Sequence, residues 1–493
     1  MFLALDQRLK LPGIALLGAL FGVVLAAGGV TAFFLCASLL GCAFVLADFR
    51  CGVVMLILLM PLSGSSTLFP HEMFGIVGLN PINLLLAGTC GSWLLHAFAD
   101  GSLRRFLPRP LLWLYVVPIL IAGAIGSRHI HEIAPSLLVV YQGLDFADAA
   151  SYLRELVLKP LLMVLFALLV AAAVAKSQRP ARFVLPAVVS MCAMAAFVPV
   201  YVAQSGIGLR ALASSDEREF LSALGLHAND LGRLYAIAYA LLLFTWAEGR
   251  DVALRWVLLA AAGLTAVALV LTFSRGAFVA LAVVNVLYVL WRRSPRTVIA
   301  AAVVGVAGLV LAPAAVYERV ATGQGAGLDA ISAGRLNGLW LPLLPEVLRH
   351  PLFGNGISSI LWSEPMRQGG GQQVLAVTHP HNAYLEALLD MGLVGTTLLC
   401  AYFVHVWRGF RRLGKDLQLE PALRGFFQGA AAALLGMLVS DFTDSSLAPR
   451  PEQAFLWLAI GMMYGEYTRR AAVTRPLPAR TPGSCSARPI GAA

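Results

Sequence analysis

Long apolar runs recur along almost the whole chain, and they constrain the fold more than any other feature of the sequence. Of the 493 residues, 59% are hydrophobic and 13% are charged, whereas soluble domains carry about 25% charged residues. So few polar side chains cannot cover a water-exposed surface, and a helix that crosses a bilayer needs about 20 mostly apolar residues. The sequence therefore predicts an all-α, polytopic integral membrane protein.

Fourteen apolar runs are candidate membrane spans, of which about 12–14 are expected to cross, since the first two could form one re-entrant hairpin and Pro61 interrupts the third. The runs cover residues 11–28, 30–47, 51–68, 76–98, 110–126, 156–175, 183–204, 234–248, 256–273, 276–291, 297–313, 384–406, 425–443 and 454–467.

The runs divide the chain into five parts. These are N-terminal transmembrane helices (1–175), central transmembrane helices (176–313), a large outside loop (314–383), C-terminal transmembrane helices (384–470) and a tail expected to be disordered (471–493). In the large loop, the amphipathic stretch around Trp340 and Leu344 is expected to rest at the membrane interface.

Basic residues mark one side of the membrane. Of the 36 Lys and Arg residues, 24 fall in alternate short loops or in the terminal segments, such as Arg292, Arg293 and Arg296. Cytoplasmic loops carry such an excess, so both termini are expected in the cytoplasm of a bacterial inner membrane. Topology therefore explains the net charge of +10, and no nucleic-acid-binding pattern is present.

One histidine lies at the predicted start of a span on the outward side. In the segment Thr378-His379-Pro380-His381-Asn382, Pro380 disfavours helix at His379 and Asn382 is a good N-cap for the apolar helix that follows. A helix N-terminus is expected to present free N–H groups and a partial positive charge, which suit a phosphate, and an imidazole exchanges protons near neutral pH. His381 is therefore a candidate catalytic residue. The alternative is a histidine that only caps the helix at the interface.

Two outward arginines are candidate ligands for an anion. Arg275 follows Ser274 in a tight turn between two apolar runs, where a basic residue departs from the positive-inside pattern. Its planar guanidinium suits a diphosphate; the alternative is an anchor to a lipid headgroup. Arg233 enters the first turn of a span, where a cation opposes the helix dipole. The alternative there is an ion pair with Asp230 or with the acidic residues at 216–219.

The large outside loop and the following span add four candidates. Arg335 is placed to reach a phosphate, and the Gly354-x-Gly356 segment is interpreted as a tight turn that packs the loop. Glu386 and Asp390 lie four residues apart on one helical face. They either pair with arginines of neighbouring spans or take part in chemistry.

No cofactor or metal is expected. His379 and His381, like His129 and His131, lack neighbouring carboxylate or thiolate ligands in a recognisable pattern, and none of the seven cysteines forms a C-x-x-C pair. No P-loop or Rossmann fingerprint is present either, which argues against a nucleotide-driven enzyme.

Taken together, these motifs resemble those of the O-antigen ligase and polymerase superfamily. The His381-Asn382 pair followed by Gly392-x-x-Gly395, the Ser274-Arg275-Gly276 turn and the His350-to-Gly356 segment occur in the order typical of that superfamily. The resemblance covers residues of about 180–465.

This resemblance implies a C-type glycosyltransferase-like fold and a metal-independent glycosyltransferase that uses a glycan carried by undecaprenyl diphosphate at the periplasmic face. His381 would be the general base that activates an acceptor hydroxyl of lipid A-core. The diphosphate would be held by Arg275, Arg233 and Arg335. The supporting residues would be Asn382, Ser274, Glu386 and Asp390.

Other functions stay open. Within the superfamily, the acceptor is alternatively a growing O-antigen or exopolysaccharide chain, or a protein serine or threonine. Outside it, a transporter of the same lipid-linked glycan would place ionisable residues near mid-membrane. A structural subunit of an envelope assembly would leave the outward arginines unexplained. Membrane lipids are the further expected partners, and the sequence does not specify an oligomeric state.

Overall fold

A computed structural model describes residues 7–65, 72–73, 76–101, 106–134, 137, 146, 148–206, 208, 221, 227–321, 327–368, 377–443 and 447–473. The predicted all-α architecture is confirmed, with one exception: a two-residue antiparallel hairpin in which Glu72 pairs with Val77. The predicted disordered tail lies outside the described residues from residue 474 onward, as does the acidic segment at 216–219.

The helices and strands follow one another along the chain as listed here. The N-terminal part contains α1 (Gln7–Ala47), α2 (Phe49–Leu59), η2 (Met60–Leu62), β1 (Glu72–Met73), β2 (Ile76–Val77), α3 (Pro81–Asp100), α4 (Arg109–Leu111), η4 (Leu112–Val116), α5 (Val117–Gly126), η5 (Ile130–Glu132), α7 (Ala149–Leu153), η6 (Arg154–Leu158), α8 (Lys159–Ala175), η7 (Pro180–Phe183) and α9 (Val184–Ser205). The remainder contains α11 (Ala228–Glu248), α12 (Val252–Val270), α13 (Arg275–Arg292), α14 (Pro295–Leu311), α15 (Ala314–Ala321), α16 (Leu328–Ile331), η9 (Leu336–Trp340), α17 (Leu341–Arg349), η10 (Ser359–Trp362), α18 (Glu364–Arg367), α19 (Ala383–Gly414), α20 (Pro421–Ser440), η11 (Pro451–Gln453) and α21 (Ala454–Val473).

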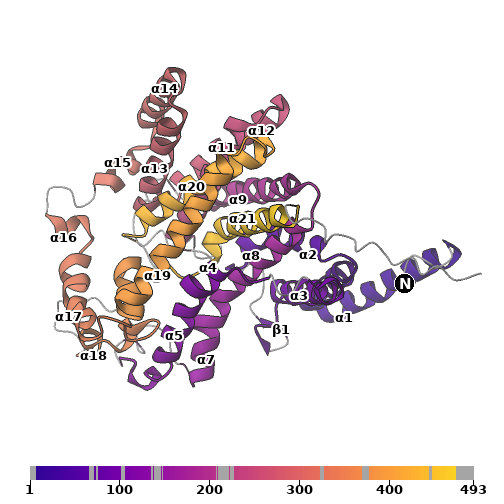
Figure 1. Ribbon diagram of the computed structural model, residues 1–493, viewed down its shortest axis with the longest axis horizontal. Helices are drawn as coiled ribbons and strands as arrows, with labels where there is room; N and C mark the ends of the chain where they lie inside the picture. The colour runs from indigo at the N-terminus through magenta and orange to yellow at the C-terminus, as the bar shows by residue number, and fades with distance from the viewer. Residues whose placement is uncertain are drawn as a thin grey trace, which may run out of the picture.

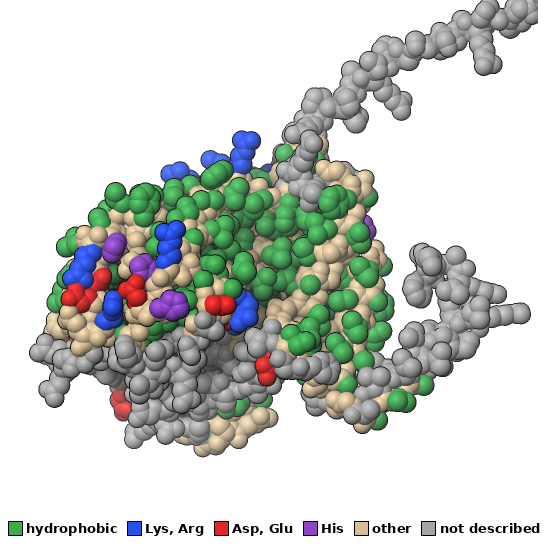
Figure 2. Space-filling model, turned by 90° about the horizontal axis from the view of Figure 1, so that it is seen from below, with side chains coloured by type: hydrophobic (Ala, Val, Ile, Leu, Met, Phe, Trp, Pro, Cys, Tyr) green, Lys and Arg blue, Asp and Glu red, His purple; other side chains and the backbone are tan. Residues whose placement is uncertain are grey.

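Eight helices among the described residues are long and apolar enough to cross a membrane. They are α3, the continuous segments α4–α5, α7–α8 and η7–α9, and then α12, α13, α19 and α20. The other predicted runs also form helices, in α1, α2, α11, α14 and α21, so the total of about 12–14 spans stays a prediction. Hydrophobic side chains dominate the surface in Figure 2, and charged ones gather toward the side where Figure 1 draws α17 and α18. This surface is the one expected of a multi-pass membrane protein.

Two Gly-x-x-x-Gly segments hold the centre of the bundle together. Gly425 and Gly429 of α20 face the backbone of α11, and a Cβ atom at Gly429 would lie 2.6 Å from the Ala240 carbonyl oxygen. Gly461 and Gly465 of α21 face α8 in the same way. Small residues let helix backbones approach closely, which compensates for the weak hydrophobic drive between helices in lipid. These four helices lie together in the middle of Figure 1.

The two ends of this bundle carry different chemistry. At the end that we call the basic end, Glu248 of α11 accepts hydrogen bonds from Arg424 of α20 (2.8 Å, through Nε) and pairs with Arg292 of α13 (2.8 Å). Because α20 runs antiparallel to α11 and α13, its last residues meet the first residues of both at the opposite end. The candidate residues Arg233 and Arg275 lie at that opposite end.

Helix α19 is broken at Gly392, and the break is filled by residues 351–356, part of a segment that the sequence predicts to lie outside and that we call the outside segment. Gly392 has φ 62° and ψ −167°, which interrupts the helical hydrogen bonds. The carbonyl oxygens of Leu389 and Asp390 instead accept from the amides of Asn355 (2.8 Å) and Gly356 (3.0 Å). On the other side of the break, the amides of residues 393 and 394 donate to the carbonyl oxygens of residues 351 and 352. The interpretation of Gly354-x-Gly356 as a turn that packs the loop is confirmed.

Trp340 is half-buried against the protein, and its expected position at the membrane interface stays a prediction. Its indole N–H donates to the Pro380 carbonyl oxygen (2.8 Å), and the neighbouring Leu339 and Leu343 are fully buried in a second core cluster with Leu389 of α19. The face of this stretch that includes Leu339 and Leu343 therefore packs on the protein. Leu344 lies on the other face and is 47% exposed.

We expect Gly354→Ala to destabilise the protein more than the control Gly101→Ala. Both glycines have φ near 70°, so each alanine costs roughly 1–2 kcal/mol of backbone strain. A Cβ atom at Gly354 would also overlap the main chain of Asp390 and Met391, whereas at Gly101 nothing lies within 4 Å. That overlap should cost about 1–3 kcal/mol more. Thermal unfolding in detergent measures the difference, and equal losses would contradict the docking of this segment.

Candidate functional site

The residues at and directly after the end of α20 connect three of the segments that the sequence singled out. The Asp441 carbonyl oxygen accepts from the amide of Ala383, two residues after His381 (2.9 Å). The Thr443 carbonyl oxygen accepts from a terminal nitrogen of Arg335 (3.0 Å). A Cβ atom at Gly276 would lie 3.4 Å from the Thr443 hydroxyl oxygen. The segments of His381, Arg335 and Arg275 therefore converge on residues 440–443, which we call the α20 end.

His381 occupies a strained position directly before α19. Its φ is 51°, an uncommon value for a residue with a side chain, and its ring lies 4.1 Å from that of His379 between centroids. Both histidines are half-buried. The hydrogen bond from the Trp340 indole N–H to the carbonyl oxygen of Pro380 holds the residue between the two histidines. Such strain persists only where surrounding contacts determine it, and it is enriched at functional sites.

The predicted N-cap at Asn382 is confirmed, but the expected free amides are not found. The Asn382 side-chain oxygen accepts from the amides of Tyr384 and Leu385 (3.1 Å each), and the Ala383 amide donates to Asp441. The expectation that this helix end offers free N–H groups to a phosphate is therefore wrong. A phosphate near His381 would have to be held by side chains.

The turn before α13 presents Arg275 on a capped helix. The Ser274 hydroxyl accepts from the amide of Ala277 (3.4 Å), so Ser274 is the N-cap, and Phe273 before it has φ 50°. Arg275 is the first residue of the helix and is half-buried. The turn therefore places Arg275 at the same end of the bundle as residues 440–443.

Arg319 of α15 lies at the same turn and was not singled out from the sequence. Its Nε donates to the Phe273 carbonyl oxygen (3.3 Å). Burial, followed by the positive charge of Arg275, lowers the pKa of Arg319 from its usual value. The signal that would have found it is the one used for Arg275, a basic residue in a segment predicted to lie outside.

Arg233 is enclosed by protein. Its side chain is 2% exposed and forms ion pairs with Glu452 (3.1 Å) and Asp441 (3.5 Å). These partners differ from Asp230 and the acidic segment that the sequence suggested. Burial, followed by the negative charge of Asp230, raises the pKa of Glu452 to about 7. The cluster ties the start of α11 to the α20 end and to η11, so in this structure Arg233 is engaged with internal carboxylates.

Asp390 holds the outside segment rather than an arginine. Its carboxylate accepts from the amides of Ser358 and Ser359 (3.0 Å each) and from the Ser359 hydroxyl (2.9 Å). The expected pairing of Asp390 with an arginine of a neighbouring span is therefore wrong. Glu386, one turn earlier, is half-buried. Sequence spacing placed Glu386 and Asp390 on one helical face. It did not indicate that serines 31 and 32 residues away would be the hydrogen-bond partners of Asp390.

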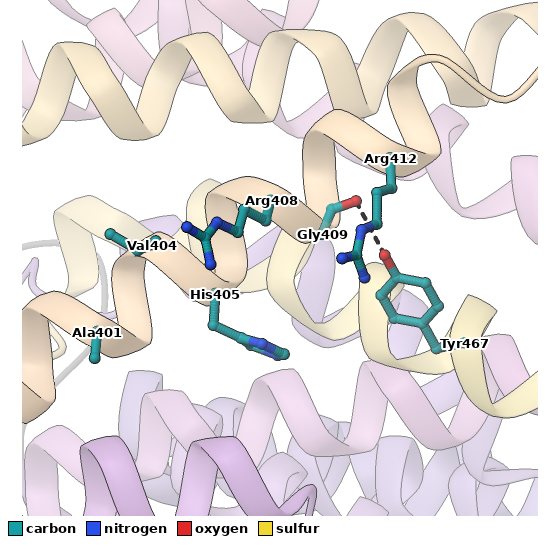
Figure 3. Close-up of a pocket in the computed structure, with 7 residues that line it drawn as sticks. All are labelled: Ala401, Val404, His405, Arg408, Gly409, Arg412 and Tyr467. Atoms are coloured by element: carbon teal, nitrogen blue, oxygen red, sulfur yellow. Dashed lines mark hydrogen bonds between the residues drawn. The ribbon is translucent and has the colours of Figure 1, made fainter.

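The part of the chain that the structure describes contains no group of three His, Cys, Asp or Glu side chains arranged to hold a metal ion. A pocket drawn in Figure 3 lies between α19 and α21 at the basic end and includes none of the residues discussed above. We therefore identify the candidate site by the residues that contact the α20 end and not by this pocket.

We expect Asp390→Ala to lower the unfolding temperature more than Asp390→Asn. Alanine leaves two buried amides without an acceptor, at about 1–3 kcal/mol each, whereas asparagine keeps one acceptor oxygen. Thermal unfolding in detergent, read alongside turnover, is the measurement. Unchanged stability with lost turnover would instead indicate a chemical role for this carboxylate.

Residues 260–400 match a family described as O-antigen ligase. The matched region begins in α12, includes Arg275, Arg319, Arg335 and His381, and ends beyond the break in α19. No curated protein matches the chain. The matched region supplies most of the segments that meet at the α20 end, and it lies within a bundle of membrane-spanning helices. The chain is therefore a multi-pass membrane protein, and its residues 260–400 are similar to the O-antigen ligase family.

Proposed function

We propose that the protein transfers a glycan from undecaprenyl diphosphate to an acceptor hydroxyl at the periplasmic face of the bacterial inner membrane. The observation that carries the proposal is the convergence of the segments of His381, Arg275 and Arg335 on the α20 end. This end lies opposite the basic end, and basic loops are typical of the cytoplasmic side. The site would then face the periplasm, and both termini the cytoplasm.

His381 is proposed to be the general base. An imidazole nitrogen takes the proton of the acceptor hydroxyl while the hydroxyl oxygen attacks the anomeric carbon of the donor sugar. The bond from that carbon to the diphosphate oxygen breaks, and undecaprenyl diphosphate leaves with the electron pair. A diphosphate is a stable leaving group, so proton removal and charge neutralisation account for the chemistry without a metal.

Arg275, Arg335 and Arg319 are proposed to hold the diphosphate. Guanidinium groups form paired hydrogen bonds with phosphate oxygens, and a diphosphate would relieve the repulsion between Arg275 and Arg319. Because Arg233 already binds Asp441 and Glu452, we assign it the positioning of the α20 end. Asn382 and Ser274 support the site as helix caps, and Asp390 holds the outside segment.

The proposed acceptor is a lipid A-core sugar, with a growing polysaccharide chain or a protein hydroxyl as the alternatives. Gel analysis of surface glycans in a deletion strain tests the choice. Loss of long chains from lipid A-core supports the ligase. Single-repeat products indicate the polymerase, and loss of glycan from protein indicates protein glycosylation. Unchanged surface glycans of all three kinds would contradict glycan transfer.

We expect His381→Ala to reduce glycan transfer at least about 100-fold while the protein remains inserted, because general-base catalysis contributes about that factor or more. His350→Ala is the matched control, since this exposed histidine lies in the same outside region and its hydrogen bonds are made by its backbone, from its amide to the Glu346 carbonyl oxygen and from the Gly354 amide to its carbonyl oxygen. Transfer is measured with purified protein and lipid-linked donor. Activity close to wild type in the His381 variant would exclude the proposed base.

We expect Arg275→Ala and Arg319→Ala each to lower kcat/KM for the donor about 10–100-fold, the equivalent of one lost charge-assisted hydrogen bond. Lysine at either position should recover part of the loss, because it keeps the charge but not the planar fork. Arg367→Ala is the control, since Arg367 is exposed and pairs with Glu132. If Arg319→Ala behaves like Arg367→Ala, Arg319 has no part in donor binding.

A further inference from the structure

A second place in the molecule has the features of a binding site. The pocket of about 330 Å³ at the basic end is lined by six residues of α19 and by Tyr467 of α21. The Tyr467 hydroxyl donates to the Gly409 carbonyl oxygen (3.2 Å), which closes one side. Figure 3 shows His405, Arg408 and Arg412 extending from α19 around this space. It lies at the opposite end of α19 from His381.

Most arginines near this pocket are engaged with protein groups. Arg424 binds Glu248, Arg469 and Arg470 bind Glu466, and the Arg411 guanidinium lies 3.9 Å from the Trp291 ring centroid. By contrast, within the described chain no carboxylate forms an ion pair with Arg408 or Arg412. Both side chains are exposed and both line the pocket. Two guanidinium groups one helical turn apart therefore present an anion-binding surface.

An apolar surface leads to these two arginines along α19. Val404 lies one turn before Arg408 on the same helical face and is 45% exposed, and it lines the pocket together with Ala401. Leu393 and Val394, nearer the other end of the helix, are 53% and 40% exposed. A free phosphate would use only the basic end of this surface. A molecule with a phosphate and a hydrocarbon chain would use all of it.

We propose that this pocket binds the phosphate headgroup of an anionic membrane lipid. Arg408 and Arg412 contact the phosphate, and the hydrocarbon chain lies along the exposed face of α19 that includes Val404. Basic pockets between transmembrane helices on the cytoplasmic side are suited to such headgroups. The site is separate from the proposed glycan-transfer site and does not depend on it.

The test compares wild type, the double variant Arg408→Gln/Arg412→Gln and the control Arg250→Gln/Arg296→Gln. The control removes two exposed arginines that do not line the pocket. Each purified protein is titrated in detergent with dioleoylphosphatidylglycerol, dioleoylphosphatidylcholine or inorganic phosphate. Lipid binding is followed by thermal unfolding and by native mass spectrometry. The unfolding temperature without lipid shows whether each variant is folded.

Phosphatidylglycerol should raise the unfolding temperature of wild type and control saturably, and it should bind the pocket variant at least about tenfold more weakly. The variant Arg408→Lys/Arg412→Lys should recover most of the binding, because it restores both charges. Equal binding by the pocket and control variants would overturn the proposal. So would equal stabilisation by phosphatidylcholine, which lacks net charge, or by inorganic phosphate, which lacks the chain.

Discussion

The break in α19 is the constraint on which the rest of the site depends. In lipid-facing surroundings, backbone N–H and C=O groups have no water to bond, so a broken helix must find other partners. Gly392 frees the carbonyl oxygens of Leu389 and Asp390, and the amides of Asn355 and Gly356 satisfy them. The outside segment is therefore fixed to the helix that begins beside His381. Without this docking, Trp340 and the Pro380 segment that it binds would lack a fixed relation to the bundle.

A second set of buried interactions fixes the α20 end. Arg233, Asp441 and Glu452 come from three different elements and are almost completely buried. Removing one member of a buried ion pair leaves an uncompensated charge, which is strongly destabilising, so each residue depends on the other two. The cluster keeps Asp441 where its carbonyl oxygen meets the Ala383 amide. The position of His381 thus follows from electrostatics in α11 and η11 as well as from its own helix.

The bundle carries two groups of proposed anion-binding residues, one at each of its ends. At the α20 end, the segments that carry Arg275, Arg335 and His381 meet, and Arg319 of α15 binds the turn before Arg275. At the basic end, Glu248 and Glu466 form ion pairs with four arginines, and Arg408 and Arg412 line the pocket. The antiparallel packing of α11 with α20 accounts for the distance between the two sites. It places the first residues of α11 beside the last residues of α20 at one end of the bundle, and the reverse at the other end.

The sequence by itself determined the helical membrane architecture and the candidate residues His381, Arg275 and Arg335, because apolar length, charge asymmetry and helix capping are local properties. It also predicted the turn at Gly354, since glycine permits the left-handed conformation found there. Only the tertiary structure decided the partners. Arg233 binds Glu452 at a separation of 219 residues, Arg319 binds the Phe273 carbonyl oxygen in the turn before Arg275, and Asp390 binds serines of an outside segment. Those contacts depend on which helices lie side by side, and the pattern of apolar residues that sends every helix into the membrane does not specify its neighbours.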